Sequence, residues 1–202
     1  MRAAPGRVRE PGSGASDGGA SDGGASDGGA SDGGVTDVEP SAEYRRAIEE
    51  NERYVAVFDR SKLTAAPHRG LAILACMDAR IDVEDALGLR VGDAHIIRNA
   101  GGLATEDAVR SLVVSQQLLG TEEILLIAHT GCGLDGADED DIRARVLRTT
   151  GAATDLVFGA FADLDTMVRE QVAVLREHPA LRRVPVHGLI YEVETGRLRE
   201  VA

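Results

Sequence analysis

The chain has 202 residues, with 34 Asp and Glu against 22 Lys and Arg, and a formal net charge of −12. This length suits one domain with an appended segment. The acidic balance argues against binding to nucleic acid or to anionic membrane surfaces, both of which recruit basic patches. No apolar run approaches the roughly 18 residues that a membrane span needs. No apolar stretch follows the first arginines either, so we expect a cytoplasmic protein without a secretory signal.

Arginine supplies almost all of the basic charge. Lys62 is the single lysine among the 22 basic residues. An excess of Asp and Glu together with abundant Ala and Gly is typical of a GC-rich genome and also of a salt-rich cytosol. Composition does not separate codon bias from adaptation to salt, so it supports only statements about surface charge and solubility.

The N-terminal segment is a low-complexity repeat. Residues 15–34 are four tandem copies of Ala-Ser-Asp-Gly-Gly. A stretch rich in Gly and Ser, with one acid per repeat, cannot bury a hydrophobic core. We therefore expect residues 1–40 to form a disordered acidic tail and residues 41–202 to form the folded domain.

Hydrophobic periodicity predicts a series of elements after this tail. A helix is expected at 42–58, with Ser41 as its N-cap. Strands are expected at 71–76, 94–98, 123–129 and 184–193, and a last strand at 197–201 forms a hairpin with the fourth. Helices are expected at 82–87, 106–119, 138–148 and 156–177, with Gly159 as a break in the last one. Strands that alternate with helices indicate an α/β fold with three layers, a mostly parallel central sheet and an antiparallel terminal strand.

Two short segments carry side chains with metal-binding and acid–base chemistry. Cys76-Met77-Asp78-Ala79-Arg80 follows the first predicted strand, and His129-Thr130-Gly131-Cys132-Gly133 follows the third. Ligands of open α/β sheets bind at the carboxyl ends of the strands. If these two strands are neighbours, two thiols, an imidazole, a carboxylate and a guanidinium meet at one point.

Two thiolates and an imidazole are a donor set that selects zinc over magnesium or calcium. Three protein ligands with an open position are typical of catalytic zinc, and four closed ligands are typical of structural zinc. Asp78 can produce either arrangement by binding the metal or withdrawing from it. A disulfide between Cys76 and Cys132 is the alternative, which a reduced cytoplasm disfavours.

The motifs C-x-D-x-R (Cys76, Asp78, Arg80) and H-x-x-C-G (His129, Cys132, Gly133) resemble those of the β-class carbonic anhydrases. The segment 92–102 and the terminal hairpin 188–198 are also similar to that family. The resemblance covers roughly residues 42–202 and is greatest to the short branch found in archaea and actinobacteria. One departure is Gly131, which stands where near relatives are expected to have Asp.

The resemblance implies reversible hydration of CO2 to bicarbonate and a proton by a zinc-bound hydroxide. It implies a sheet order of 2-1-3-4, helices on both faces, and a homodimer or a dimer of dimers. Cys76, His129 and Cys132 then hold one zinc ion per chain. Asp78 is the fourth ligand in a closed form and the hydrogen-bond partner of the zinc-bound water in an open form, with Arg80 as its ion-pair partner.

Two other functions remain open at this point. The same fold and metal set resemble carbonyl sulfide and carbon disulfide hydrolases, and substrate choice depends on pocket shape that sequence does not reveal. A non-catalytic interaction module stabilised by zinc is the third hypothesis. Retention of both Asp78 and Arg80 argues against it, because a purely structural site needs no arginine that competes for its carboxylate. His95 is a candidate proton shuttle because it lies within the resemblance.

Overall fold

The computed structural model describes residues 39–60 and 63–202, and the chain divides into two units, Met1–Phe58 and Asp59–Ala202. The predicted acidic tail therefore lies almost entirely outside the described residues. The described part of the first unit holds helix α1 (Ala42–Val55). The Ser41 side chain accepts a hydrogen bond from the Tyr44 backbone N–H, which confirms Ser41 as the N-cap. No side chain of α1 is buried.

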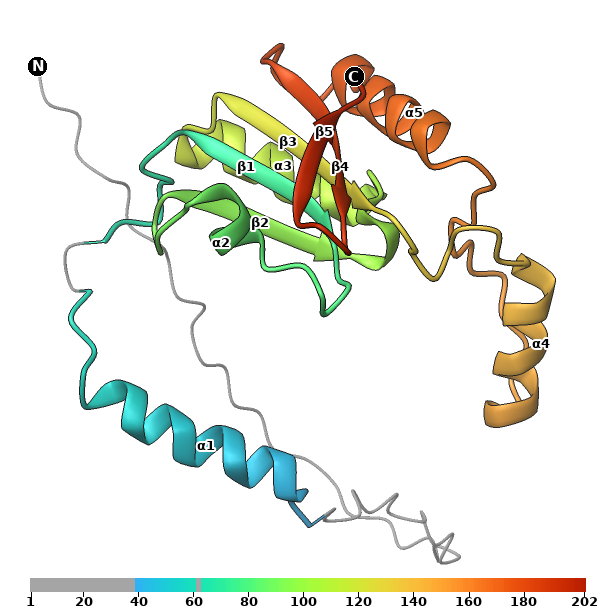
Figure 1. Cartoon of the computed structure of the whole chain (residues 1–202), viewed down its shortest axis with the longest axis horizontal. Helices are drawn as coiled ribbons and strands as arrows, with labels where there is room; N and C mark the ends of the chain where they lie inside the picture. Colours follow the sequence, from blue (N-terminus) through green and yellow to red (C-terminus); the bar gives the residue numbers. More distant parts are fainter. Residues whose placement is uncertain (1–38, 61–62) are drawn as a thin grey trace, which may run out of the picture. The chain divides into compact units, whose positions relative to one another are not determined.

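A five-stranded sheet forms the centre of the second unit (Figure 1). Its strands are β1 (Leu71–Cys76), β2 (Ala94–Asn99), β3 (Glu123–His129), β4 (Val186–Glu192) and β5 (Arg197–Glu200). Their order is β2-β1-β3-β4-β5, with β5 antiparallel to β4 and all other pairs parallel. The predicted fold and strand order are therefore confirmed, and β1 and β3 are direct neighbours.

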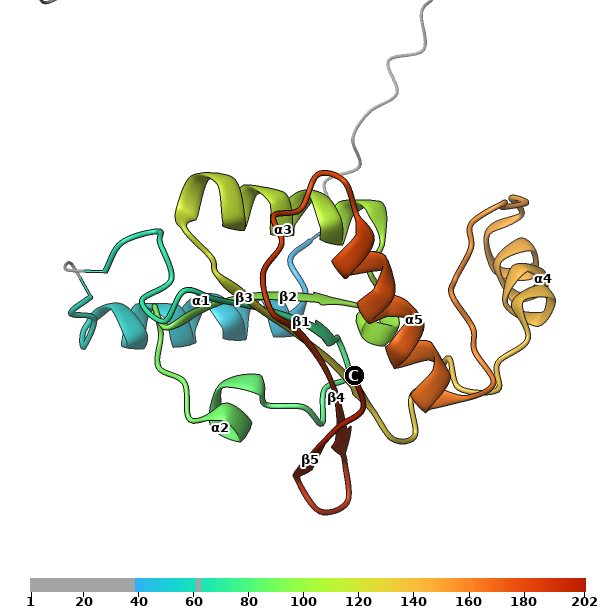
Figure 2. The same ribbon diagram turned by 90° about the horizontal axis from the view of Figure 1, so that it is seen from above.

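Helices cover both faces of this sheet (Figure 2). On one face lie α3 (Glu106–Leu119) and α5 (Leu164–Glu177), and on the other lies the short α2 (Val83–Leu87). Two hydrophobic cores lie between these helices and the sheet. One contains Leu112 of α3, Val168 of α5 and Leu126 of β3, and the other contains Val83 of α2 and Ile73 of β1. Because β1 lies between two cores, all six of its residues are buried, as expected for a continuous apolar strand.

The predicted helix at 156–177 is wrong in its first half. Helix α5 begins only at Leu164, where the Asp163 side chain accepts a hydrogen bond from Thr166 N. The segment before it is irregular because the Glu139 carboxylate accepts hydrogen bonds from the backbone N–H groups of Phe158, Gly159 and Ala160. Glu139 belongs to α4 (Glu139–Thr150), so a contact far away in sequence overrides local helical periodicity.

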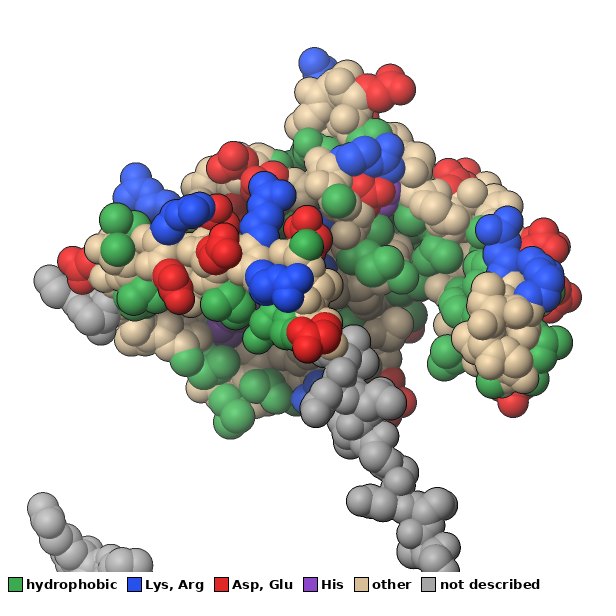
Figure 3. All heavy atoms as spheres, turned by 90° about the horizontal axis from the view of Figure 1, so that it is seen from below, with side chains coloured by type: hydrophobic (Ala, Val, Ile, Leu, Met, Phe, Trp, Pro, Cys, Tyr) green, Lys and Arg blue, Asp and Glu red, His purple; other side chains and the backbone are tan. Residues whose placement is uncertain are grey.

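Acidic and basic side chains are interspersed on the protein surface. Figure 3 shows a face on which carboxylates and arginines stand side by side, with hydrophobic side chains between them. Ion pairs such as Arg110 with Asp107 at 2.6 Å and Arg143 with Glu139 at 2.8 Å bring opposite charges together. Of the helices in residues 39–60 and 63–202, none is long and apolar enough to cross a membrane.

Candidate metal centre

The sheet brings together the three candidate metal ligands. Cys76 is the last residue of β1, His129 is the last residue of β3, and Cys132 lies in the following loop. Because β1 and β3 pair in parallel, their carboxyl ends meet at one edge of the sheet. The two sulfur atoms and an imidazole nitrogen lie within 4.8 Å of one another, and all three residues are buried.

The hydrogen bonding of His129 prepares one of its ring nitrogens for a ligand. Its Nδ1 lies 3.0 Å from the Thr130 carbonyl oxygen. A carbonyl oxygen only accepts hydrogen bonds, so Nδ1 carries the proton and Nε2 carries the lone pair. Nε2 is buried and has no hydrogen-bond partner among the described residues, which is costly for a polar atom unless a ligand such as a metal ion binds it.

The thiols have the chemistry that the site needs. Both cysteines are free, so the alternative of a disulfide is not realised. Burial raises the pKa of the Cys132 thiol, and a divalent cation bound beside it would offset this by favouring the thiolate. Two sulfurs and one imidazole nitrogen match the donor preference of zinc. The residues present therefore fit a zinc ion held by three protein ligands.

The Asp78 carboxylate lies next to the candidate metal ligand His129, and Arg80 binds it. The guanidinium binds the carboxylate with two hydrogen bonds, Nε to Oδ1 at 2.9 Å and Nη2 to Oδ2 at 2.8 Å. The Arg80 backbone N–H adds a third at 2.9 Å. These bonds hold the pKa of Asp78 well below its usual range, so Asp78 is a carboxylate at neutral pH. Its Oδ2 lies 3.7 Å from His129 Nε2, beside the lone pair.

Arg80 also connects the two ligand-bearing loops. Its Nη2 donates to the Gly131 carbonyl oxygen at 2.9 Å, which ties the loop after β1 to the loop after β3. Gly131 has a positive φ of 65°, and a Cβ there would lie 3.9 Å from the Arg80 guanidinium. Gly131, which stands where near relatives are expected to have Asp, therefore lies against Arg80. Because glycine has no side chain, position 131 does not compete with Asp78 for the Arg80 guanidinium.

Arg98 is a residue of the site that the sequence pattern did not identify. Its Nε donates to the Cys76 carbonyl at 2.9 Å and its Nη2 to the Asp78 carbonyl at 2.6 Å. Arg98 lies on β2 and so holds the turn that carries Cys76 and Asp78. Gly102 supports the same strand end, because a Cβ there would stand only 3.0 Å from the Cys76 nitrogen.

The other histidines lie away from the metal ligands. His95 pairs with Ala72 near the start of β1, at the opposite end of the sheet from Cys76. Its ring nitrogens contact the Ser115 hydroxyl at 2.6 Å and the Ala65 carbonyl at 2.8 Å. His187 lies near the start of β4, opposite Leu125. The geometry therefore gives no support to His95 as a proton shuttle, and His129 is the one histidine that the sheet places at the site.

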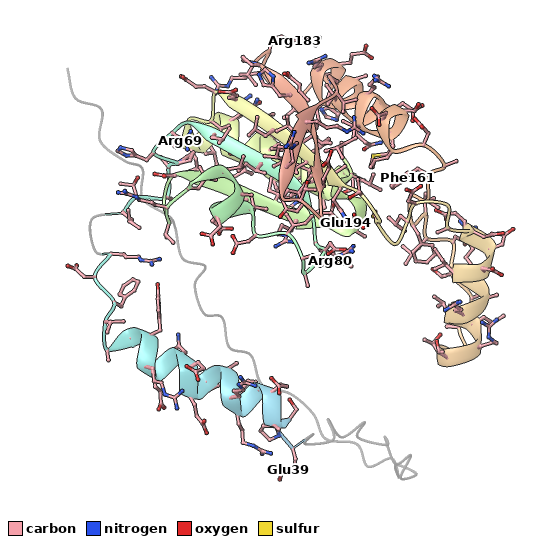
Figure 4. The ribbon with its side chains drawn as sticks, in the orientation of Figure 1. Glu39, Arg69, Arg80, Phe161, Arg183 and Glu194 are labelled. Carbon is pink, nitrogen blue, oxygen red and sulfur yellow. The ribbon has the colours of Figure 1, made fainter. Side chains whose placement is uncertain are left out.

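A cleft opens beside Arg80. It has a volume of about 540 Å³ and lies between the loop after β3 and the β4–β5 hairpin. Its lining includes Arg80, Thr130, Glu194 and Arg199. Figure 4 shows Arg80 and Glu194 at the same end of the sheet, where the carboxyl ends of the strands lie. The cleft exposes Arg80, the partner of Asp78, to small solutes.

An open α/β sheet with two sulfurs and one imidazole nitrogen at the ends of adjacent strands, and a carboxylate beside them, defines a zinc-dependent enzyme of the α/β class. The comparisons with known proteins agree. The family model described as carbonic anhydrase matches residues 71–198. The chain belongs to the β-carbonic anhydrase family, which uses zinc.

Individual relatives include both carbonic anhydrases and carbon disulfide hydrolases. The β-carbonic anhydrase 1 of Mycobacterium tuberculosis is 38% identical over 143 residues, covering 70% of this chain and 88% of the relative. A carbon disulfide hydrolase of Acidithiobacillus thiooxidans is 40% identical over 162 residues, covering 69% and 81%. The crystal structure of carbonic anhydrase from Streptococcus mutans matches with a TM-score of 0.77 at 39% identity, covering 81% of this chain and 99% of that one.

We predict that Arg98 is needed for tight metal binding. Arg98→Gln removes the two guanidinium hydrogen bonds to the carbonyls of Cys76 and Asp78. Zinc binding should weaken by roughly 10–100-fold, as is typical for residues that orient metal ligands. Arg98→Lys places a compact ammonium group where the planar guanidinium stood, so zinc affinity should fall by an intermediate amount. Zinc affinity is measured by competition with a chromogenic chelator.

The matched control is Arg110→Gln, which removes an arginine from an exposed ion pair on α3 and should leave zinc affinity unchanged. Equal zinc affinities for Arg98→Gln and Arg110→Gln would show that Arg98 does not position the ligands.

Proposed function

We propose that this protein catalyses the reversible hydration of CO2 to bicarbonate and a proton, with one zinc ion per chain bound by Cys76, His129 and Cys132. The observation that carries the proposal is the buried lone pair of His129 Nε2, which faces two thiols in a chain of the β-carbonic anhydrase family. Zinc in such a site lowers the pKa of a bound water to about 7, which supplies a nucleophile at neutral pH.

Asp78 and Arg80 are the proposed catalytic residues of the chain. An ionised carboxylate only accepts hydrogen bonds, so Asp78 can orient a nucleophile that donates to it. Arg80 holds the carboxylate in one orientation through its bidentate bonds and keeps it charged. In this arrangement Asp78 is bound by Arg80. We propose that Asp78 becomes a fourth ligand in a closed, inactive form when that pair opens.

Hydrolysis of carbon disulfide or carbonyl sulfide is the second candidate function. The 40% identity to the Acidithiobacillus thiooxidans enzyme is the observation that favours it. Both substrates are linear molecules with cumulated double bonds, so the same nucleophile attacks them. Rates with CO2 and with CS2 on one zinc-loaded preparation distinguish the two functions, and we expect the CO2 rate to be the larger.

A third candidate, a non-catalytic interaction module with structural zinc, receives no support from the geometry of Asp78. A structural site closes with four protein ligands. Here the fourth candidate, Asp78, makes three hydrogen bonds to Arg80 instead.

We propose that the activity resides in residues 41–202 and that residues 1–40 are an acidic extension outside the catalytic domain. The proposal also places the protein in the cytoplasm. The buried free thiols of Cys76 and Cys132 suit a reducing compartment.

We predict that Asp78 and Arg80 control activity without controlling metal content. Arg80→Ala releases Asp78 to bind zinc, and Asp78→Ala removes the acceptor that orients the nucleophile. Each variant should retain zinc, because three ligands remain, and should lose activity by roughly 10²–10⁴-fold. Zinc content is measured by elemental analysis beside the CO2 hydration rate from pH 6.5 to 9 by stopped flow. Raising the pH should favour the open form.

Arg110→Ala is the control for loss of an exposed arginine, since Arg110 pairs with the exposed Asp107 on α3 rather than with a residue of the candidate metal centre. A near-normal hydration rate in zinc-loaded Asp78→Ala or Arg80→Ala would remove the pair from the mechanism. Loss of zinc from both variants would show that the pair only braces the loop.

We also propose that the protein is a homodimer or a dimer of dimers, with α1 as the contact element. Tyr44, Ile48 and Val55 of α1 are exposed to 57%, 47% and 63%, which is unusual for large hydrophobic side chains on one short helix. A surface helix of this kind gains stability when its apolar residues are covered by another subunit.

Light scattering of the full chain should therefore give at least twice the mass of 21.3 kDa at micromolar concentration. The double substitution Ile48→Glu, Val55→Glu should shift the mass toward the monomer, whereas Glu49→Gln, a charged position of the same helix, should not. A monomer for the unmodified chain would contradict the proposal.

A further inference from the structure

A cluster of arginines surrounds a small cavity outside the metal centre. The cavity has a volume of about 250 Å³ and lies between the C-terminal end of α5 and the start of β4. Three of the eight residues that line it are arginines, Arg176, Arg182 and Arg183, beside the apolar side chains of Leu175 and Pro185. These arginines lie outside the two metal-binding motifs, and Figure 4 shows Arg183 far from Arg80.

Backbone carbonyl groups hold the three guanidinium groups in place. Arg176 Nη2 donates to the Val186 carbonyl at 2.6 Å, and Arg182 Nη2 donates to the Thr121 carbonyl at 2.5 Å. Arg183 Nη1 donates to the Arg176 carbonyl. Each guanidinium has five N–H donors, so most donors of all three groups remain free. Side chains that are already positioned lose less conformational entropy when they bind a ligand.

The cluster also keeps its positive charge. The chain has 12 more acidic than basic residues, and several arginines elsewhere in the described chain pair with carboxylates, as Arg199 does with Asp165 at 2.6 Å. In the part of the chain that the structure describes, no carboxylate forms an ion pair with Arg176, Arg182 or Arg183.

Two carboxylates lie next to His187, which lines the cavity. Glu123 and Glu200 flank His187, at 3.4 Å from Nε2 and 3.0 Å from Nδ1. Both carboxylates contact the imidazole, and within the described residues neither forms an ion pair with one of the three arginines.

We propose that this arginine cluster binds a small dianion of the phosphate type. Planar guanidinium groups bind phosphate oxygens with paired hydrogen bonds, and three of them supply more positive charge than a monoanion needs. The cavity is smaller than the roughly 300–1,000 Å³ typical of sites for drug-sized ligands, which fits a compact anion. The site is separate from the metal centre, because it lies at the amino ends of β3 and β4.

The test is titration calorimetry with inorganic phosphate on the zinc-loaded full chain at constant ionic strength. The double variant Arg182→Gln, Arg183→Gln should lower phosphate affinity at least about tenfold. The matched control is Arg145→Gln, Arg148→Gln, which removes the same charge from exposed positions on α4 and should leave affinity unchanged. Any anion bound at the metal contributes equally to both variants, so their difference reports on the cluster.

Acetate, added in place of phosphate, should bind at least tenfold more weakly to the unmodified chain. Equal phosphate affinities for the two double variants, or acetate binding as strong as phosphate, would overturn the proposal. If the Arg182 substitution prevents folding, Arg183→Gln replaces it, since the Arg183 bond to the Arg176 carbonyl is exposed whereas the Arg182 bond to the Thr121 carbonyl is partly buried. An unchanged affinity in this single variant would also overturn the proposal.

Discussion

The parallel pairing of β1 with β3 is the constraint on which the rest of the site depends. It brings Cys76 next to His129 and Cys132 although they are more than 50 positions apart in sequence. The pairing is stable because both strands are apolar and lie between two cores. A one-residue shift in register would move every side chain of a strand to the opposite face, so the same packing that stabilises the sheet also places the ligands.

Arginine side chains position the two loops that carry the candidate metal ligands. Arg80 binds both Asp78 and the Gly131 carbonyl, and Arg98 binds the carbonyls of Cys76 and Asp78. The two loops that follow β1 and β3 are thus held by permanently charged, multidentate donors. A chain with one lysine among its basic residues uses arginine both at the metal centre and, in our proposal, at a separate anion site. Lysine, with a compact ammonium group, does not provide the planar fork that these contacts use.

Much of this arrangement follows from sequence patterns. The continuous apolar run of β1, the Ser41 cap of α1 and the two motifs at strand ends predict their elements and the convergence of the ligands correctly. The irregular segment before α5 is different, because it depends on Glu139 capturing backbone N–H groups about 20 residues away. Arg98 escaped sequence reasoning for a similar reason, since its partners are backbone carbonyls that carry no sequence signal. The distance of His95 from the metal ligands is also set by the fold, because His95 lies near the start of β2 whereas the ligands lie at the carboxyl ends of β1 and β3.

The central claim is that one zinc ion at Cys76, His129 and Cys132 gives the chain its activity on CO2. The most direct test removes zinc from the full chain with a chelator and then restores it in measured amounts, with CO2 hydration followed by stopped flow. Activity should disappear with the metal and return in proportion to zinc, reaching a plateau at one ion per chain. Hydration that persists in the metal-free protein, or its absence from protein that holds one zinc at these residues, would contradict it.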